Sequence, residues 1–497
     1  MGILFMNVND KFYFNVVDFV LDKKIYVTHI TTANKELFRE EKFYNIEIID
    51  SNSFEYASKI KKLNYENNYS LSSKELDEYL ECERFFLSNS DRFCYLSISV
   101  QERIKMFQEL LLYWLNFFEK NSIECIFWDS TPHMNWDNII YYIAKKKNIK
   151  TIYLERTLLE DRVILLEDYK KIYKVPLGYL KSSSKEKLIN LLGTDLYEIS
   201  FLESKWLVRS KEINKNVISP SRIKILLRNI KRLSRIKNIF RYMRNKLKLN
   251  LCFSSTFYND ITNKFYINLL YYHNNIRTKK LRKFYKELTK EIDLEKKYIF
   301  FALQYQAERS TSPMGGYFEN QILAIDILSK SVPKDWLIYA KEHPRQFITK
   351  ELRTRHHRSE DFYRRLISYP NVKLININEP TNKLIDKSIC VSTITGSVGW
   401  EGLLKNKAAI VFGNPWYSPC NSCYVISSRE DCFSVINKIE AKSSKEIEID
   451  VLKFLVYYKN KLITSSNSYE MSIKSKVKYE KLIENLGNAI IETINKK

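Results

Sequence analysis

Residues 388–413 read SICVSTITGSVGWEGLLKNKAAIVFG. The stretch opens with a β-rich apolar run at 388–393, turns through hydroxyl residues and glycine, and continues into a helical segment at 398–405. A second apolar run follows at 408–413. Strand, helix and strand at this spacing predict two parallel strands joined by a crossover helix, the repeating unit of an α/β sheet.

The same alternation extends outward from this stretch. It begins after Lys296 and also covers residues 1–200, whereas residues 200–290 are basic, aromatic and poor in turn signals, which predicts long helices. The predicted strands are 3–8, 24–31, 44–49, 125–128, 151–154, 298–304, 336–340, 372–376, 388–393 and 408–413. The predicted helices are 104–118, 138–147, 318–330, 381–387, 398–405 and one from Phe347 onward.

These patterns predict an α/β protein with two Rossmann-like domains that face a cleft and a basic helical insert. We expect the first domain at 1–200, the insert at 201–290 and the second domain at 291–465. The tail, 466–497, is expected to form a helix that packs back on the first domain. In open α/β sheets ligands bind beyond the carboxyl ends of the strands, so we expect the functional residues to lie there.

Composition narrows the class of protein. The 497 residues are 45% apolar and 14% aromatic, which is typical of a globular chain. No apolar run approaches the roughly 18–20 residues that span a bilayer, and the start of the chain lacks the pattern of a signal peptide, so we expect a cytoplasmic protein. The formal net charge of +23 suggests an anionic partner.

The excess positive charge is concentrated between residues 221 and 248, where lysine and arginine occur without any acidic residue. The apolar residues of this segment recur every three or four positions, which places them along one helical stripe. Such a helix either lies peripherally on an anionic inner-membrane face or packs its stripe on the protein. The stripe consists of Leu226, Ile230, Leu233, Ile236, Phe240, Met243 and Leu247.

The turn in 392–402 is a candidate phosphate site. The backbone of Thr395, Gly396 and Ser397 precedes a helix, where free N–H groups and the helix dipole favour an anion. Glu401, on the first turn, could accept hydrogen bonds from a ribose diol. The alternative is an ordinary capped helix.

A second candidate lies in IYAKEHPRQF, residues 338–347. Pro344 ends the strand, which holds His343 at the strand exit, and Arg345 adds positive charge. We expect this pair to contact a phosphate; the alternative is a histidine buried for packing.

The third candidate is the loop in 302–321, where a strand leads into polar residues and a glycine pair before a helix. Gln306, Glu308 and Arg309 are expected to face the cleft, and Gly315 and Gly316 to precede an anion-friendly helix start.

In the first domain, titratable side chains follow two predicted strands, where a general base is needed. The candidates are Asp129, His133, Asp137 and Glu155. Asp137 has a second interpretation, as an acidic residue at the start of a helix.

The order of these motifs resembles bacterial capsular polysaccharide biosynthesis proteins, which include Kdo-transferase-like enzymes with the GT-B fold. The resemblance covers about 120–160, where a strand is followed by the pair PH, and about 295–420. The motifs in the second range are YQAERSTSPMGG, KEHP, STITGSVGWEGL and VFGNPWY. The resemblance implies a metal-independent glycosyltransferase whose second domain binds a nucleotide-sugar donor, CMP-linked, and whose first domain binds a glycan or lipid-linked acceptor.

The same resemblance, to GT-B sialyl- and Kdo-transferases, implies that His343 and Pro344 touch the nucleotide and its phosphate. It also implies that Thr393, Thr395 and Ser397 correspond to the Ser/Thr turn of the nucleotide-binding signature in those enzymes. The acidic motif that holds the base in many sialyltransferases is not evident, so the base stays open among Glu308 and the first-domain candidates. No cofactor other than the donor is implied.

Two other classes of protein remain open. A nucleic-acid-binding protein would interleave its basic residues with aromatics, but the basic segment carries mostly isoleucine and leucine, so we expect no nucleic-acid partner. A non-catalytic capsule assembly or export component could keep the same fold. Cys420 and Cys423 form one CxxC without a second ligand pair, so we expect no metal site.

Overall fold

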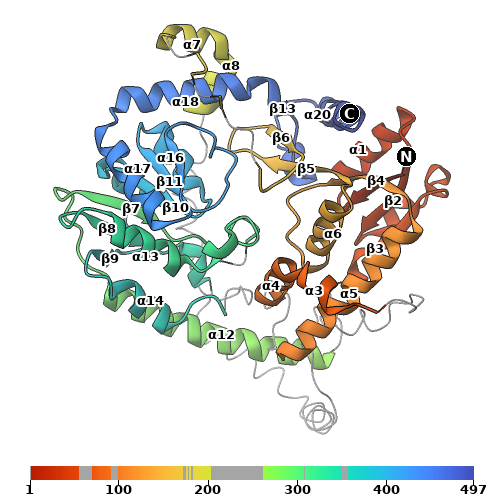
Figure 1. Cartoon of the computed structure of the whole chain (residues 1–497), viewed down its shortest axis with the longest axis horizontal. Helices are drawn as coiled ribbons and strands as arrows, with labels where there is room; N and C mark the ends of the chain where they lie inside the picture. The colour runs from red at the N-terminus through yellow and green to blue at the C-terminus, as the bar shows by residue number, and fades with distance from the viewer. Residues whose placement is uncertain are drawn as a thin grey trace.

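The computed structural model describes residues 2–54, 70–90, 99–171, 175–176, 178–180, 183–202, 261–306, 308–348 and 356–496. It contains two sheets, each covered by helices, and all but one strand of the first sheet come from the amino-terminal third of the chain (Figure 1). The basic segment 221–248, for which a membrane-surface helix is expected, lies outside the described residues.

The first sheet has seven strands in the order β13-β6-β5-β4-β1-β2-β3. The strands β3, β2, β1, β4 and β5 are parallel, whereas β6 and β13 are antiparallel additions at one edge. The order reverses between β1 and β4, which makes their carboxyl ends the switch point where ligands bind in such sheets. The strands are β1 Gly2–Met6, β2 Val27–Thr32, β3 Glu47–Asp50, β4 Ile123–Trp128, β5 Lys150–Arg156, β6 Arg162–Leu166 and β13 Ile463–Thr464.

The second sheet has six parallel strands in the order β12-β11-β10-β7-β8-β9, with its switch point between β7 and β10. Two Rossmann-like domains are thereby confirmed as the fold class. The sequence prediction missed the short strands β6, β12 and β13. The strands are β7 Tyr298–Ala302, β8 Leu337–Lys341, β9 Val372–Leu374, β10 Cys390–Thr393, β11 Ala408–Val411 and β12 Cys423–Val425.

The helices mostly follow apolar periodicity and side-chain caps. Ser99, for example, accepts a hydrogen bond from the backbone N–H of Glu102 and begins the 21-residue helix α5, whose apolar stripe is buried. The helices are α1 Lys11–Asp22, α3 Ser73–Asp77, α4 Leu80–Asn89, α5 Val100–Lys120, α6 Asn135–Lys146, α7 Lys185–Leu192, α8 Thr194–Tyr197, α12 Ile261–Leu288, α13 Gln321–Ser331, α14 Glu360–Ile367, α15 Thr381–Lys387, α16 Ser397–Leu404, α17 Arg429–Ala441, α18 Ser444–Tyr458, α19 Tyr469–Ser472 and α20 Tyr479–Asn495.

Two helix predictions require correction. The helix predicted from Phe347 is instead a single 3-10 turn, Pro344–Phe347, and α14 begins only at Glu360, behind the cap provided by Ser359. Pro344 occupies the first position of this turn, and the side chain of Ser359 accepts from the backbone N–H of Phe362 to begin α14. The helix predicted at 318 begins at Gln321, because Gly316–Glu319 forms a 3-10 turn.

Helix α12, from the stretch expected to be an insert, packs on the second domain. The hydroxyl of Tyr285 donates to the carbonyl of Ile375, 2.6 Å away, and accepts from the backbone N–H of Glu342 at 3.1 Å. Figure 1 shows α12 running past α14 along this domain. Among the described residues, no helix combines the length and apolar character needed to cross a membrane.

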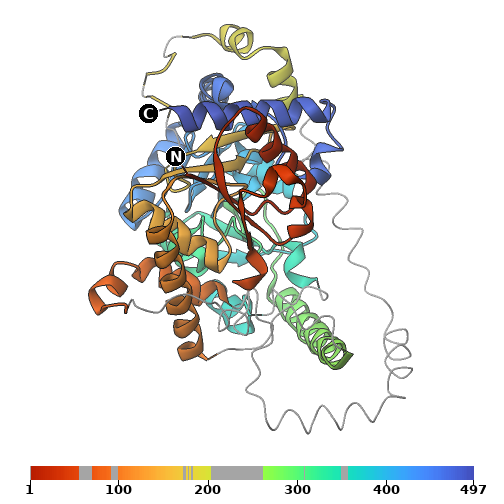
Figure 2. The ribbon, with the colours of Figure 1, turned by 90° about the vertical axis from the view of Figure 1, so that its right-hand side faces the viewer.

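The carboxyl-terminal part of the chain returns to the first domain. Strand β13 pairs antiparallel with β6, and α20 then packs along α1, as Figures 1 and 2 show. The contact between these two helices is tight: a Cβ atom placed on Gly487 would lie 2.3 Å from the ring of Phe19. Glycine at this position therefore lets α20 approach α1.

We expect Gly487→Ala to destabilise the protein by about 1–3 kcal/mol, because the added methyl overpacks the α1–α20 contact by more than helix propensity restores. Asn488→Ala, at the adjacent exposed position of α20, is the matched control and should not lower stability. Urea unfolding of the two variants measures the difference. Equal stabilities would contradict the close packing seen between α20 and α1.

Candidate functional site between the two sheets

The carboxyl ends of the two sheets face each other, and polar contacts between described residues of the two domains join them. The guanidinium of Arg309 lies 3.8 Å from the Glu155 carboxylate, and the guanidinium of Arg84 lies 3.4 Å from the Glu319 carboxylate. A third contact is the 3.3 Å hydrogen bond from the side chain of Asn414 to the backbone carbonyl of Lys170. Residues from both domains therefore line one shared cleft.

Asp129 follows β4 at the first switch point. The Ser130 hydroxyl donates to its carboxylate at 3.2 Å, and the Tyr13 hydroxyl donates to its backbone carbonyl at 3.1 Å. Burial raises the pKa of Asp129 to about 7, although Ser130 and Arg309 partly oppose the shift. A half-buried carboxyl group with this pKa is suited to accept a proton at neutral pH.

Glu155 and His133 lie on the same edge. Glu155, nearly buried, accepts a hydrogen bond from the Thr131 hydroxyl at 3.2 Å and pairs with Arg309, and burial raises its pKa. The Nδ1 atom of His133 lies 2.9 Å from the Thr131 carbonyl. Since a carbonyl only accepts, Nδ1 carries the proton and donates there. Both predicted residues thus belong to the cleft edge.

Asp137 is excluded from the set of candidate bases. It lies on the first turn of α6 and is fully buried, with Asn7 donating to one carboxylate oxygen at 3.3 Å. Burial raises its pKa well above the ordinary value. A carboxyl group with no exposed surface cannot contact a substrate in the cleft, so it cannot take a proton from one.

The predicted phosphate donors Thr393 and Thr395 have internal roles instead. The Thr395 N–H donates to the Gln304 side-chain oxygen at 2.8 Å, and its hydroxyl donates to the Ser310 carbonyl. The Thr393 hydroxyl donates to the Ala302 carbonyl at 3.2 Å. These bonds tie the exits of β7 and β10 together, which corrects the expectation that both threonines face a ligand.

The start of α16 still has the backbone geometry of the predicted phosphate site. Gly396 is the capping residue, and α16 begins at Ser397, whose hydroxyl donates to the Glu401 carboxylate at 2.8 Å. Burial raises the pKa of Glu401. The first N–H groups of a helix have no intrahelical acceptor, so this turn can still donate to an anion through its backbone.

His343 is neutral and its proton position is fixed. Burial, with help from Arg345 and neighbouring cations, lowers the pKa of His343 to about 4. Its Nδ1 atom accepts from the backbone N–H of Arg345 at 3.2 Å, so Nε2 carries the hydrogen and is the donor. The Arg345 guanidinium lies 4.8 Å from the centre of the Tyr305 ring and 3.2 Å from the Glu308 carboxylate.

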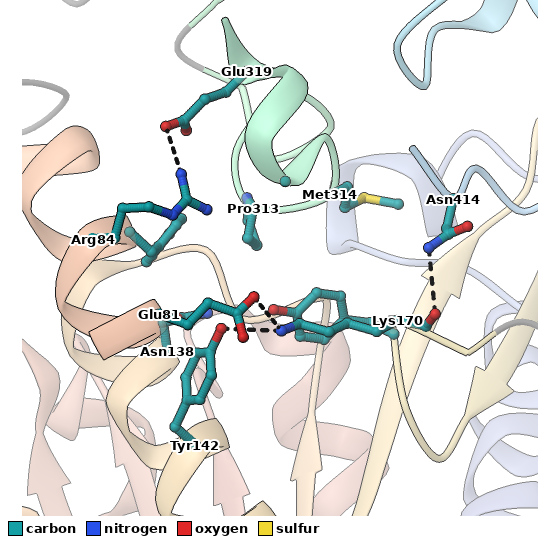
Figure 3. Close-up of a pocket in the computed structure, with 12 residues that line it drawn as sticks. Glu81, Arg84, Asn138, Tyr142, Lys170, Pro313, Met314, Glu319 and Asn414 are labelled. Carbon is teal, nitrogen blue, oxygen red and sulfur yellow. Dashed lines mark hydrogen bonds and ion pairs between the residues drawn. The ribbon is translucent and has the colours of Figure 1, made fainter. Parts of the chain in front are cut away.

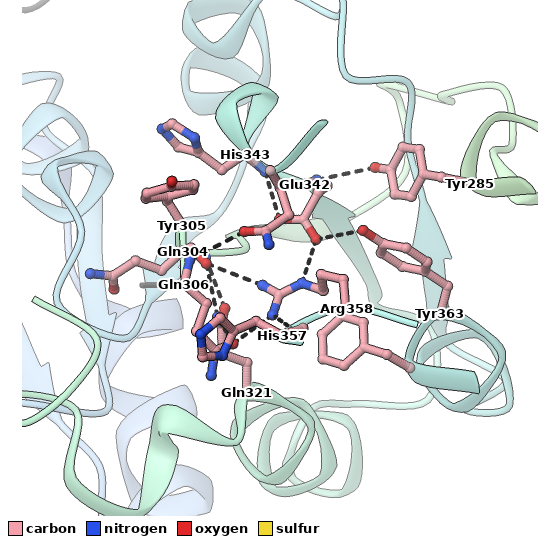
Figure 4. A network of polar contacts seen from close by, with 12 residues as sticks. Tyr285, Gln304, Tyr305, Gln306, Gln321, Glu342, His343, His357, Arg358 and Tyr363 are labelled. Carbon is pink, nitrogen blue, oxygen red and sulfur yellow. Dashed lines mark hydrogen bonds and ion pairs between the residues drawn. The ribbon is translucent and has the colours of Figure 1, made fainter. Parts of the chain in front are cut away.

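Gln306 belongs to a buried network next to His343 (Figure 4). The guanidinium of Arg358 lies 2.7 Å from the Glu342 carboxylate and 2.5 Å from the side-chain oxygen of Gln306, and the Tyr363 hydroxyl donates to Glu342 at 2.8 Å. Arg358 and Glu342 are almost completely buried. Gln306 is therefore a support for the strand exits, which corrects its predicted role in ligand binding.

Gly315 and Gly316 shape the loop after β7. A Cβ atom on Gly315 would lie 2.5 Å from the Thr311 carbonyl and 2.8 Å from Ile394, and Gly316 has φ of 53°. The loop can therefore lie close to the β10 exit only with glycine here. The glycine pair leads into the 3-10 turn Gly316–Glu319 and not directly into a helix, and the side chain of Gln321 at the start of α13 hydrogen-bonds the backbone of Gln304. An anion site at this position stays a prediction.

A pocket of 170 Å³ opens between the domains (Figure 3). The sequence prediction found only Gly316 among its residues, since the others come from helices and loops that are far apart in the sequence. It is lined by Glu81, Arg84, Phe85, Asn138, Tyr142, Tyr169, Lys170, Pro313, Met314, Gly316, Glu319 and Asn414.

Within the described ranges, no three histidine, cysteine or carboxylate side chains are grouped so that they could hold a metal ion. Cys420 and Cys423, the CxxC pair, are both buried. The absence of a metal site remains a prediction.

Comparison with solved structures shows similarity over most of the chain at low identity. The β-Kdo 2,7-transferase KpsC of Thermosulfurimonas dismutans is 11% identical, with coverage of 85% of this chain and 98% of that one and a TM-score of 0.30. The UDP-GlcNAc 2-epimerase of Methanocaldococcus jannaschii is 12% identical over 92% and 100%, with a TM-score of 0.23. Anabaena HepE, solved with UDP and glucose, is 11% identical over 99% of both chains, with a TM-score of 0.25.

No curated protein matches the sequence. A family model, described as capsule polysaccharide biosynthesis protein, matches residues 142–420. This region includes most of the second domain and the strand exits that carry His343 and the α16 turn. Because the match covers more than half of the 497 residues, it confirms the resemblance: the chain belongs to the capsule polysaccharide biosynthesis protein family.

Proposed function

We propose that this chain is a glycosyltransferase that acts in capsule polysaccharide synthesis. It transfers a sugar from a nucleotide-activated donor, CMP-linked, to a glycan or lipid-linked acceptor. The observation that supports this most directly is the facing arrangement of the two sheets: Asp129, with a pKa of about 7, lies at the first switch point, close enough to Arg309 of the second domain for its charge to lower that pKa.

In this proposal Asp129 is the general base. The acceptor hydroxyl gives its proton to the Asp129 carboxylate while its oxygen attacks the anomeric carbon of the donor. The bond from that carbon to the donor phosphate breaks, and the nucleotide leaves with the electron pair. The ion pair between Glu155 and Arg309 holds the part of the first domain that carries Asp129 against the second domain.

The leaving phosphate meets donors on the second domain. The donors at the strand exits are the Nε2–H of His343, the backbone N–H groups at the start of α16 and the guanidinium of Arg345, which also pairs with Glu308. Positive ends of dipoles and guanidinium groups stabilise negative charge as it develops on the phosphate. His343 acts as a neutral donor because its pKa of about 4 keeps it uncharged at pH 7.

We expect His343→Ala to weaken donor binding by about 10- to 100-fold, since a hydrogen bond to a charged group is worth about 1.5–3 kcal/mol. The melting temperature should stay close to that of the wild type, because the ring is only half-buried. His273→Ala, on an exposed part of α12, is the control and should bind the donor normally. Unfolding of the His343 variant would show that the histidine has a packing role.

The function is tested with a thermal-shift screen of CMP, CDP, UDP and GDP, followed by release of nucleotide from the matching donor sugar. A nucleotide at 100 times its Kd should add about 2.7 kcal/mol of stability. Stabilisation by UDP or GDP without CMP would contradict the CMP donor and leave the fold unaffected. Binding without any turnover on supplied acceptors would favour the non-catalytic capsule component.

The location of the acceptor is a separate part of the proposal. A lipid-linked acceptor lies at a membrane face, and segment 221–248 carries the apolar stripe and positive charge of a helix that lies on an anionic surface. We propose that the chain attaches peripherally there, on sequence grounds alone.

A further inference from the structure

The pocket between the domains has two walls (Figure 3). The first domain supplies Glu81, Arg84 and Lys170, together with the Tyr142 hydroxyl, and the second domain supplies the loop around Met314 and the side chain of Asn414. The two walls join at the Arg84–Glu319 and Asn414–Lys170 contacts. A ligand in this pocket would therefore touch both domains.

The charges around the pocket cancel. The Lys170 ammonium lies 2.8 Å from the Glu81 carboxylate and 3.0 Å from the Tyr142 hydroxyl. Arg84 pairs with Glu319 at 3.4 Å. Burial disfavours the charged form of Glu81, but the hydrogen bond and charge of Lys170, the hydrogen bond from Tyr142 and the charge of Arg84 together leave the pKa of Glu81 below its usual value. Each of the two cations is paired with one carboxylate, so their formal charges cancel.

We propose that this pocket binds one uncharged sugar residue of the acceptor glycan; the assignment to the acceptor rests on the proposed function above. Each sugar hydroxyl both donates and accepts a hydrogen bond, and the pocket presents carboxylate acceptors beside ammonium, guanidinium and amide donors. The apolar faces of Phe85, Tyr169 and Met314 lie next to these groups and suit the C–H face of a sugar ring.

Size and charge select against other ligands. The 170 Å³ volume is below the roughly 300–1,000 Å³ typical of sites for larger ligands, so one ring fits better than a whole nucleotide. A phosphate or an acidic sugar would have to displace a carboxylate from Lys170 or Arg84, which removes the electrostatic gain.

The pocket is placed for an acceptor by the loop after β7. Met314 lines the pocket, and Arg309, five residues earlier in the same loop, pairs with Glu155 and lies near Asp129. A glycan with one ring in the pocket can therefore extend along this loop toward the proposed base.

The test uses the full-length protein and methyl glycosides of glucose, galactose, mannose and N-acetylglucosamine, with glucuronic acid and inorganic phosphate as charged probes. Binding is measured by saturation-transfer NMR and titration. We expect at least one neutral glycoside to bind the wild type. Glu81→Gln should weaken that binding at least tenfold, and Met314→Trp, which fills the pocket, should abolish it.

Glu78→Gln is the matched control, because Glu78 forms a similar exposed ion pair, with Lys146, outside the pocket. It should bind the glycoside like the wild type, and all variants should melt within a few degrees of one another. Preference for phosphate or glucuronic acid would overturn the proposal, as would failure of every neutral glycoside to bind. Unchanged affinity in both the Glu81 and the Met314 variants would overturn it as well.

A parallel transfer assay separates this proposal from the proposed function. Glycoside binding that depends on Glu81, in a protein that transfers no sugar, would contradict the transferase and support a sugar-binding pocket. Active transfer with an acceptor KM that is unchanged in Glu81→Gln would support the transferase and overturn the role of the pocket. An acceptor KM raised at least tenfold, with the donor KM unchanged, would support both.

Discussion

Asp129→Asn is expected to lower kcat for sugar transfer by about 10²- to 10⁴-fold while leaving donor affinity unchanged. The amide keeps the shape of the carboxyl group but cannot accept the proton of the acceptor hydroxyl, and general-base catalysis is worth about this factor. The measurement is single-turnover transfer, with donor binding determined separately by titration.

The pH dependence gives a second measurement of the same group. Because the base works only when deprotonated, kcat/KM of the wild type should rise with pH through about 7 and then level off. The variant should lose this rise. Burial also raises the folded-state pKa of Asp129 above the unfolded value near 3.8, so the stabilisation that it gives below pH 4 is lost as the pH rises through about 7. The asparagine variant should therefore melt higher than the wild type at pH 8.

Asp137→Asn is the matched control for this experiment. Its carboxyl group is fully buried and cannot contact a substrate, so an amide of the same shape should change kcat by less than a few-fold. If Asp137→Asn were inactive and Asp129→Asn fully active, the assignment of the base would be wrong. Full activity of both variants would move the search to Glu155, His133 and Glu308.

Arg358→Met is expected to destabilise the second domain by about 3–5 kcal/mol. The substitution leaves the Glu342 carboxylate buried without its cation, 2.7 Å from where the guanidinium lay, and removes the shorter of the two hydrogen bonds to the side-chain oxygen of Gln306. His343 should also shift, because its backbone N–H donates to Glu342 at 2.8 Å. Urea unfolding measures the loss of stability, and nucleotide titration measures the shift through donor affinity.

Arg364→Met provides the control. Arg364 pairs with Glu360 at 3.7 Å, but both side chains are more than half exposed, so removing the cation should change stability by at most about 1 kcal/mol. Comparable losses of stability in the two variants would mean that the buried Arg358–Glu342 pair stabilises the domain no more than an exposed pair does. Restored stability in Glu342→Gln combined with Arg358→Met would support it, since the unpaired charge is then gone.

The sequence alone was sufficient for the fold class and for the position of several functional candidates. Stretch 388–413 predicts strand, turn, helix and strand, and the structure contains β10, α16 and β11 there, because apolar periodicity and turn chemistry are local properties. The exit of β8 was likewise placed by Pro344, which ends a strand whatever surrounds it. The short strands β6, β12 and β13 were missed, since each forms only by pairing with a neighbour.

The roles of individual side chains were decided by the tertiary structure. Thr395 has the sequence context of a phosphate donor, yet its N–H and hydroxyl are bonded to Gln304 and Ser310, 91 and 85 residues away along the chain. Asp137 was a plausible base until packing buried it, and the pKa of Asp129 is raised by burial that no local pattern encodes. The interdomain pocket combines residues from 81 to 414. Periodicity and caps depend on neighbours in sequence, whereas burial, pKa and pocket shape depend on which distant segments meet in the folded chain.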